Sequence, residues 1–142
     1  MSARLRVAVP GHLLALAPFG GHAKMWHRVL AGLADHVEIV AAEPRRLRRP
    51  DVVLCSGHDD LPAARAPLVA QIHEAGWRDP ELRAVLSPAF LDHIAPRTEA
   101  AAHAGALVIT GAQRVAEDLT EAFGVEPERL RVVPHGVDPG FT

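Results

Sequence analysis

Short apolar runs alternate along the chain with segments of helical periodicity, and Pro or Gly ends most of the runs. Six runs have the length of strands, at residues 5–9, 37–42, 51–55, 68–72, 106–110 and 130–133. The first contains Val7-Ala8-Val9, and consecutive apolar positions of this kind are typical of strands buried on both faces of a sheet. Strands that alternate with helices pair in parallel through right-handed crossovers. The pattern therefore predicts a doubly wound α/β fold with a mainly parallel sheet of about six strands.

Two segments carry clear helix signals. Apolar residues recur at helical spacing after the first run, at Met25, Trp26, Val29, Leu30 and Leu33. The clearest helix is predicted over residues 112–123, with Arg114 and Asp118 paired at i,i+4 and with Gly124 placed to end the helix in the left-handed conformation. Between the first strand and the first helix, over residues 11–21, we expect a loop.

Prolines shape the stretch between the fourth and fifth runs. Asp79 and Pro80 are typical of a helix start, as the N-cap and the first helical residue. Pro88 and Pro96 follow them. Because a proline in a helix interior removes a hydrogen bond and clashes with the preceding turn, we expect residues 81–103 to form two or three short helices.

Size and composition narrow the class of protein. The chain has 142 residues, which suits a single domain spanning 1–142. Its formal net charge of −2 gives no basic field for a nucleic-acid partner. Cys55 is the only cysteine, so no intramolecular disulfide can form. No window approaches the roughly 20 apolar residues that a membrane span needs, and we expect a cytoplasmic protein.

In a doubly wound fold, ligands bind at the carboxyl ends of the strands. This rule selects five segments: 11–21, 56–60, 73–77, 110–113 and 135–138. Neither a G-x-G-x-x-G fingerprint nor a Walker lysine motif follows the first run. The sequence therefore disfavours dinucleotide oxidoreductases and Walker-type nucleotide binding.

Three stretches together resemble a known family. Pro18-Phe-Gly-Gly21 leads into a helix and then into Leu33-Ala-Asp-His-Val-Glu-Ile-Val40. Ala106-Leu-Val-Ile-Thr110 leads into Val115-Ala-Glu-Asp-Leu119. The third stretch, Phe123-Gly-Val-Glu-Pro-Glu-Arg-Leu-Arg-Val-Val-Pro-His-Gly-Val-Asp138, is the most specific because of its Val-Pro-His-Gly-Val-Asp ending. Over nearly its whole length the chain is similar to the N-terminal domain of family-4-like GT-B glycosyltransferases.

The resemblance implies an enzyme in which two Rossmann-like halves face each other. This chain would be the acceptor-side half, and the donor-binding C-terminal GT-B domain, absent from residues 1–142, would be supplied in cis or in trans. The implied reaction is a retaining one of the hexosyltransferase type, which moves a sugar from a nucleotide-diphosphate sugar to a hydroxyl acceptor without a metal or other cofactor. The leaving phosphate itself would take the acceptor proton. The chain alone is expected to be inactive.

The resemblance also points to residues for the reacting sugar and for the donor phosphate. His73 follows the fourth run and matches a histidine that contacts the transferred sugar or the acceptor, so it is the expected catalytic residue. Gly20 and Gly21 precede the first helix, where backbone amides make an anion site for the donor phosphate. The residue types alone leave open that His73 only finishes a strand and that the glycines only form a turn.

Further residues at strand ends are expected to line the cleft for acceptor or substrate: His58, Asp59, Glu74, Thr110 and Gly111. Loop capping and ordinary strand-to-helix turns are the alternative readings. The residue types of His58-Asp59-Asp60 are ones that can bind a metal. No second pair of ligands has metal-binding spacing, so no metal site is expected. Residues 135–138 could reach the cleft or could only set the crossover to the second half, and we favour the structural role because Pro and Gly there fix the backbone shape.

The segment 44–50 holds four arginines: Arg45, Arg46, Arg48 and Arg49. A solvated loop is the favoured reading. The sharper hypothesis is a contact with anionic lipid or with a phosphorylated acceptor, which would place the protein at the inner face of the membrane.

Two other functions remain open. The chain could be a stand-alone binding or assembly module that pairs with a separate donor-domain chain through an exposed apolar face. It could also be half of a GT-B sugar-nucleotide epimerase, which shares the two-half architecture. The Val-Pro-His-Gly-Val-Asp ending favours the transferase.

Overall fold

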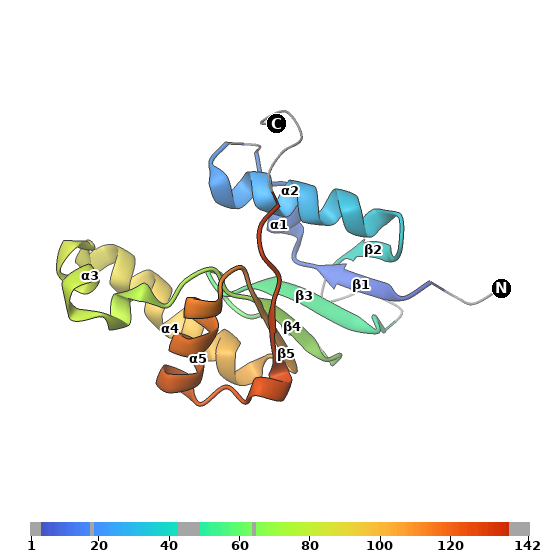
Figure 1. Cartoon of the computed structure of the whole chain (residues 1–142). Helices are drawn as coiled ribbons and strands as arrows, with labels where there is room; N and C mark the ends of the chain where they lie inside the picture. Colours follow the sequence, from blue (N-terminus) through green and yellow to red (C-terminus); the bar gives the residue numbers. More distant parts are fainter. Residues whose placement is uncertain (1–3, 18, 43–48, 64, 137–142) are drawn as a thin grey trace. The chain divides into compact units, whose positions relative to one another are not determined.

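The computed structural model describes residues 4–17, 19–42, 49–63 and 65–136 (Figure 1). In this part of the chain, six strands form a sheet in the order β2-β1-β3-β4-β5-β6. Their bounds are Arg6–Val9 (β1), Glu38–Ala41 (β2), Val52–Ser56 (β3), Leu68–Gln71 (β4), Leu107–Thr110 (β5) and Leu130–Val132 (β6). β1 pairs in parallel with β2 and β3, and β5 pairs in parallel with β6. The predicted α/β, Rossmann-like fold is confirmed, and each strand lies within one residue of the run predicted for it.

The chain divides into two compact units. The first comprises residues 1–55 and 62–69, and the second comprises residues 56–61 and 70–142. β1 and β2 belong to the first unit, β5 and β6 belong to the second, and β4 is shared between them. The second unit therefore contains most of the strand ends that the sequence singled out, those at 56–60, 73–77, 110–113 and 135–138.

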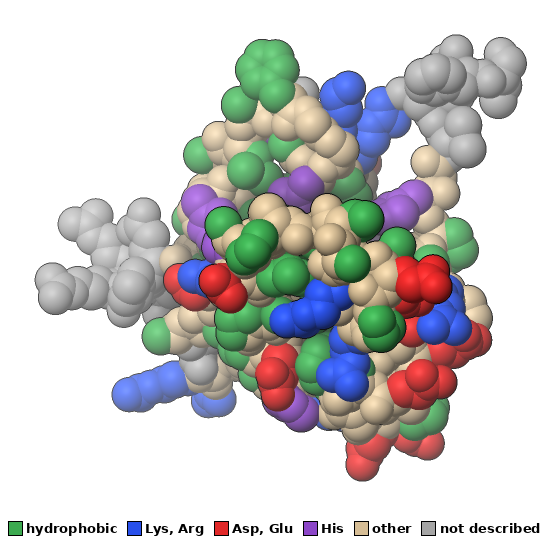
Figure 2. Space-filling view, turned by 90° about the vertical axis from the view of Figure 1, so that its left-hand side faces the viewer, with side chains coloured by type: hydrophobic (Ala, Val, Ile, Leu, Met, Phe, Trp, Pro, Cys, Tyr) green, Lys and Arg blue, Asp and Glu red, His purple; other side chains and the backbone are tan. Residues whose placement is uncertain are grey.

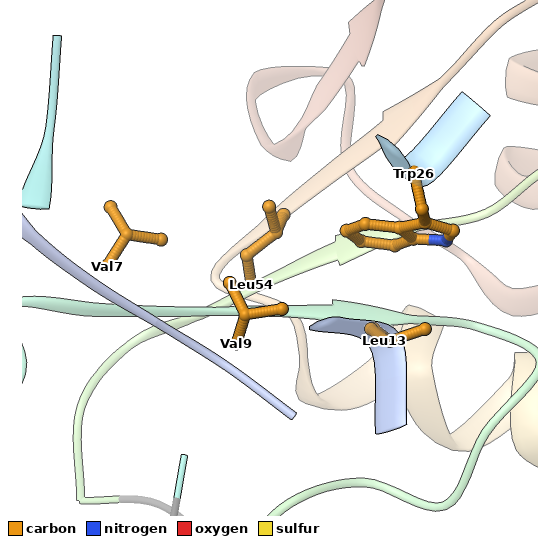
Figure 3. Packing of buried hydrophobic residues seen from close by; sticks show 5 residues of the cluster. All are labelled: Val7, Val9, Leu13, Trp26 and Leu54. Carbon is orange, nitrogen blue, oxygen red and sulfur yellow. The ribbon is translucent and has the colours of Figure 1, made fainter. Parts of the chain in front are cut away.

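A hydrophobic cluster forms the core of the first unit. Figure 3 shows its five buried members: Val7, Val9, Leu13, Trp26 and Leu54. The Trp26 indole is only 1% exposed. Partly buried residues of α2 (Gly21–Ala34) pack against the cluster, as helical spacing predicted: Met25, Leu30 and Leu33. Val29 was predicted on the same face but is 38% exposed, so the buried stripe of α2 is narrower than the sequence suggested.

A short helix, α1 (Gly11–Leu14), begins the segment for which we expected a loop. Pro10 precedes it with a φ of −50°, and the Pro10 carbonyl accepts a hydrogen bond from the Leu13 N–H at 2.9 Å. Leu13 is 2% exposed within the core cluster of the first unit. The loop prediction was wrong at this point, because burial of Leu13 stabilises a helical turn that the helix propensity of these residues does not indicate.

The core of the second unit combines residues of β4 and β5 with two helices, α4 (Pro88–Ala104) and α5 (Gln113–Phe123). Side chains that are at most 1% exposed include Ala70, Ile72, Ile94, Thr98, Val108 and Leu119. The predicted details of α5 are confirmed, since Arg114 and Asp118 form an ion pair at 3.0 Å and Gly124 ends the helix with a φ of 63°. An i,i+4 pair on a helix contributes only about 0.3–0.5 kcal/mol, so burial of Ala116 and Leu119 does more than this pair to hold α5 in place.

The predicted helix start at Asp79 is confirmed. It begins α3 (Pro80–Val85), and its carboxylate accepts a hydrogen bond from the Glu81 N–H at 2.8 Å. Pro88 occupies the first turn of α4, and the Ser87 hydroxyl accepts a hydrogen bond from a backbone N–H of that turn at 3.2 Å. Pro80 and Pro88 each lie in the first turn of a helix, where a backbone N–H has no intrahelical acceptor, so the missing proline N–H costs no hydrogen bond.

Pro96 does not break the helix, contrary to the sequence-based expectation. α4 continues through it as a single helix of 17 residues, so residues 81–103 form only α3 and α4. Ile94 and Thr98 are buried on either side of the proline. The Arg97 guanidinium also donates to the His93 carbonyl at 2.9 Å, in the turn that the proline ring disturbs. Burial of this face outweighs the hydrogen bond that the proline removes.

Arg129 fastens the segment before β6 to the end of α4. It ends the 3₁₀ turn η2 (Pro127–Arg129), and its guanidinium donates to the carbonyls of Ala102 at 2.8 Å and of Gly105 at 3.1 Å. Carbonyls at a helix C-terminus lack intrahelical donors, so the Arg129 guanidinium provides the missing hydrogen-bond donors. Because β6 starts at the next residue, Arg129 also fixes where that strand begins.

Gly20 and Gly21 provide a matched test of the start of α2. Gly20 has a φ of 84° and a ψ of 161°, a region that essentially only glycine adopts. An added Cβ would meet nothing within 4 Å at either residue, so backbone conformation alone separates the two positions. We predict that Gly20→Ala lowers the free energy of unfolding by about 1–3 kcal/mol. Gly21→Ala should leave it unchanged or raise it by up to about 1 kcal/mol. Denaturant unfolding measures both, and equal effects would contradict the account.

Candidate functional site

Residues from four strand ends come together in the second unit, and three of them are histidines. His58 follows β3, His73 follows β4, Gly111 follows β5 and His135 follows β6. The ring centroid of His73 lies 5.3 Å from that of His58 and 5.9 Å from that of His135. We call these three imidazoles the histidine cluster. It lies at the carboxyl ends of parallel strands, where doubly wound folds bind ligands.

Backbone contacts hold the turn after β3 against β4 and α4. The Gly57 N–H donates to the Gln71 carbonyl at 2.8 Å, and the Gly57 carbonyl accepts a hydrogen bond from the Thr98 hydroxyl at 3.2 Å. A Cβ on Gly57 would lie 2.9 Å from Cγ1 of Ile72. Glycine therefore permits the close approach that places the next residue, His58, beside the end of β4.

His58 contacts both His73 and Glu74. Its ring meets the His73 ring edge-on at 66°, and its Nε2 lies 3.7 Å from the Glu74 carboxylate. The two side chains of the latter pair are 24% and 48% exposed, so solvent screens the charge interaction that forms when His58 is protonated. The His58 carbonyl accepts a hydrogen bond from His93 Nε2 at 3.1 Å, which anchors the backbone of this turn to α4.

His73 occupies the centre of the cluster. Its ring is stacked on His135 with an interplanar angle of 22°, and it makes an edge-on contact with His58. Its Nδ1 lies 3.1 Å from the side-chain nitrogen of Gln71. Two ring contacts and a hydrogen bond together restrict the orientation of this imidazole, as a preorganised site requires.

Gly111 leaves room for His135. A Cβ on Gly111 would lie 2.5 Å from Nε2 of His135, and the Val133 N–H donates to the Thr110 carbonyl at 2.8 Å where the chain leaves β6. The sequence analysis favoured a backbone role for residues 135–138. The ring contacts add the His135 side chain to the cluster, and residues 137 and 138 lie outside the described residues.

Two other predicted cleft residues, Thr110 and Asp59, differ in how far they are buried. Thr110 is fully buried, and its Oγ1 has no hydrogen-bond partner within the described part of the chain. Asp59 is partly buried, and its N–H donates to the Ser56 carbonyl at 3.3 Å. The neighbouring Asp60 forms an ion pair with Arg97 at 3.0 Å. Contact of Thr110 or Asp59 with a substrate stays a prediction.

The surface charge is mixed. Figure 2 shows acidic, basic and hydrophobic side chains interspersed on one face, in keeping with the net charge of −2. Across the described residues, no group of three or more His, Cys, Asp or Glu side chains is placed to hold a metal ion. Metal-independent chemistry stays a prediction.

Gly20 and Gly21, predicted to contact the donor phosphate, lie in the first unit. Gly20 is the N-cap of α2 and offers no side chain to the first turn, which also contains no acidic residue. The positive end of the helix dipole is therefore not offset within its own first turn. Backbone amides there are suited to an anion, and the role itself stays a prediction.

The arginine-rich segment is described only at its end. Arg49 donates to the Arg65 carbonyl at 3.0 Å. Arg45, Arg46 and Arg48 lie outside the described residues, so the membrane contact stays a prediction. None of the described helices is both long enough and apolar enough to pass through a bilayer.

The fold and the strand-end site are shared by many α/β proteins, so they do not by themselves name a family. A model of Glycosyltransferase Family 4 matches residues 8–141. The chain belongs to Glycosyltransferase Family 4. The match confirms the resemblance read from the three stretches of sequence, and it indicates a glycosyltransferase type of activity in general. A comparison with curated proteins gave no match.

Sequence reasoning about this glycosyltransferase domain missed Gln71. This residue is 8% exposed and contacts His73, two positions along the chain. Alternate residues of an extended chain point to the same side, so a glutamine two residues before the expected catalytic histidine was the available signal. His135 had a weaker signal, because its contact with His73 depends on the path of β6.

Gly111 and Gly136 provide a matched test of the histidine cluster. We predict that Gly111→Ala displaces the His135 ring from His73, because the new Cβ would lie 2.5 Å from His135 Nε2. Gly136→Ala should preserve the stacking, since nothing lies within 4 Å of its added Cβ. The nuclear Overhauser effect between the two rings measures the contact. Its survival in Gly111→Ala, or its loss in Gly136→Ala, would contradict the assigned packing.

Proposed function

We propose that this domain forms the acceptor side of a retaining glycosyltransferase. The enzyme would move a sugar from a nucleotide-diphosphate donor to a hydroxyl acceptor without a metal. The observation that carries the proposal is the histidine cluster at the strand ends of the second unit, with His73 at its centre. Membership of Glycosyltransferase Family 4 supports sugar transfer in general.

His73 is the residue proposed to contact the transferred sugar. A neutral imidazole donates one hydrogen bond and accepts another, so it can bind a sugar hydroxyl and steady the charge that develops in the transition state. The contacts with His58 and His135 support a fixed ring orientation. Such an imidazole contributes by orientation and electrostatics, which lower the barrier only when the group is already in place.

His58 and Glu74 are proposed to receive the acceptor. The Glu74 carboxylate is 48% exposed and accepts hydrogen bonds, as sugar or other hydroxyl groups require. His58 contacts both this carboxylate and His73, at 3.7 Å from the Glu74 oxygen and 5.3 Å between imidazole centroids. This arrangement supports an acceptor hydroxyl held near the sugar that His73 contacts.

The proposed transfer needs no protein base. The acceptor oxygen bonds to the anomeric carbon while the bond from that carbon to the phosphate oxygen breaks on the same face. The acceptor proton passes to the departing phosphate, and a nucleoside diphosphate leaves. Configuration at the anomeric carbon is therefore retained, and the side chains of this domain serve to bind, orient and stabilise.

Gly20 and Gly21 are proposed to contact the donor phosphate. The first N–H groups of a helix lack intrahelical acceptors, and α2 has 14 residues, enough for a developed dipole. Most of the nucleotide would be held by a donor-binding GT-B domain supplied in cis or in trans. By itself this domain is proposed to be inactive.

The role of His73 is tested in the enzyme that combines this domain with its donor-binding domain. We predict that His73→Ala lowers kcat/KM by about 10²- to 10³-fold, the size expected for losing one preorganised donor to developing charge. His36→Ala is the matched control, because His36 is an exposed histidine outside the cluster. Release of nucleoside diphosphate from a panel of UDP-, GDP- and ADP-sugars measures turnover, and NMR of the product gives the anomeric configuration.

The outcomes separate the parts of the proposal. Equal kcat/KM values for His73→Ala and the unmodified enzyme would remove His73 from catalysis. An inverted anomeric centre in the product would contradict the retaining mechanism. Epimerisation of the nucleotide sugar without transfer to an acceptor would contradict the transferase assignment itself.

A further inference from the structure

Gln71 is a buried polar residue placed against the proposed catalytic histidine. It is the last residue of β4 and is 8% exposed. Its carbonyl is occupied by the Gly57 N–H at 2.8 Å, which fixes the backbone. Its side-chain nitrogen lies 3.1 Å from Nδ1 of His73. The ring nitrogen of His73 that this amide contacts is Nδ1.

The direction of this hydrogen bond follows from the donor and acceptor chemistry of the two groups. The amide nitrogen of glutamine carries two hydrogens and accepts none. When it faces Nδ1, that ring nitrogen must accept, so the single proton of a neutral imidazole lies on Nε2.

The opposite orientation of the amide is less favourable. In the present orientation the side-chain oxygen Oε1 of Gln71 is buried without a partner among the described residues. Reversing the amide would pair Oε1 with an Nδ1–H of His73 but would move both N–H bonds to the place where Oε1 has no donor to meet. The present orientation pairs one of the two amide N–H bonds with Nδ1, whereas the reversed amide would pair neither of them with His73. Unpaired buried N–H groups are rarer and costlier than under-satisfied oxygens.

We propose that Gln71 is a positioning residue that holds His73 as the neutral Nε2–H tautomer. It acts through His73 and makes no contact with the reacting atoms itself. The consequence for transfer rests on the proposed function: an Nε2–H imidazole donates a hydrogen bond from the nitrogen opposite Gln71. This suits a retaining transfer, in which the leaving phosphate rather than the protein takes the acceptor proton.

A carboxylate at the same position would reverse this arrangement. Glutamate is close to glutamine in shape, but when ionised it only accepts hydrogen bonds. Opposite His73 it would draw a proton to Nδ1. A leucine would fill the space without any hydrogen bond and would leave both tautomers available.

The experiment is ¹⁵N NMR of the imidazoles in the 142-residue chain, at a pH where histidine is neutral. Loss of signals in His73→Gln assigns the His73 nitrogens. We expect Nδ1 of His73 to resonate as an unprotonated nitrogen and Nε2 as a protonated one. In Gln71→Glu, Nδ1 should become protonated, and in Gln71→Leu both nitrogens should move to intermediate, averaged positions. Gln113→Leu is the control, since Gln113 is an exposed glutamine of α5 whose amide contacts Glu117.

Three results would overturn the inference. They are a protonated Nδ1 in the unmodified chain, an unchanged His73 spectrum in Gln71→Glu, and an equal change in Gln113→Leu. If Gln71→Leu fails to fold, the spectra of the unmodified chain and of Gln71→Glu are sufficient to test the inference.

This measurement does not depend on transferase activity, so the two proposals fail separately. A confirmed tautomer with no effect of His73→Ala on turnover would leave the inference standing and remove His73 from catalysis. Where both hold, Gln71→Glu in the active enzyme should lower kcat with a smaller change in KM for the donor, because it alters the His73 donor while leaving the rest of the binding surface intact.

Discussion

The approach of Gly57 to the end of β4 is the contact on which the candidate site depends. Its N–H donates to the Gln71 carbonyl at 2.8 Å, and a Cβ there would lie 2.9 Å from Ile72 Cγ1. On the other side of β4, the Ile72 N–H donates to the Ile109 carbonyl at 2.9 Å. Backbone hydrogen bonds thus bring three strand ends of the second unit together before any side chain contributes. The backbone at two of these ends places His58 and His73, and the end of β5 carries Gly111.

The side chains then refine what the backbone brings together. His73 is oriented by contacts with the rings of His58 and His135 and by the Gln71 amide at 3.1 Å. The His135 ring fits because Gly111 has no side chain. A group held in this way has little orientational freedom to lose when a ligand binds, which favours catalysis by orientation and electrostatics. Such an arrangement suits a domain of Glycosyltransferase Family 4 whose side chains bind and orient the substrates.

The strands could be predicted because consecutive apolar residues signal burial on both faces, a property local to each run. The position of His73 followed from the rule that strand ends bind ligands. Local sequence signals gave wrong predictions at Leu13 and Pro96. Burial of Leu13 stabilises a helical turn where a loop was expected, and burial beside Pro96 keeps α4 continuous where a break was expected. Gln71 was missed, and a backbone role was favoured for His135, because the contacts of both side chains depend on side-chain register between strands, which a single sequence does not reveal.

The central claim is that the histidine cluster meets the sugar during transfer. The most direct measurement is the imidazole NMR spectrum of the active enzyme, with its donor-binding domain present, as the nucleotide sugar that supports turnover is added. The account predicts that the His73 and His58 signals move with donor or acceptor occupancy, while those of His36 and His103, outside the cluster, stay in place. Full turnover with unmoved His73 and His58 signals would contradict it.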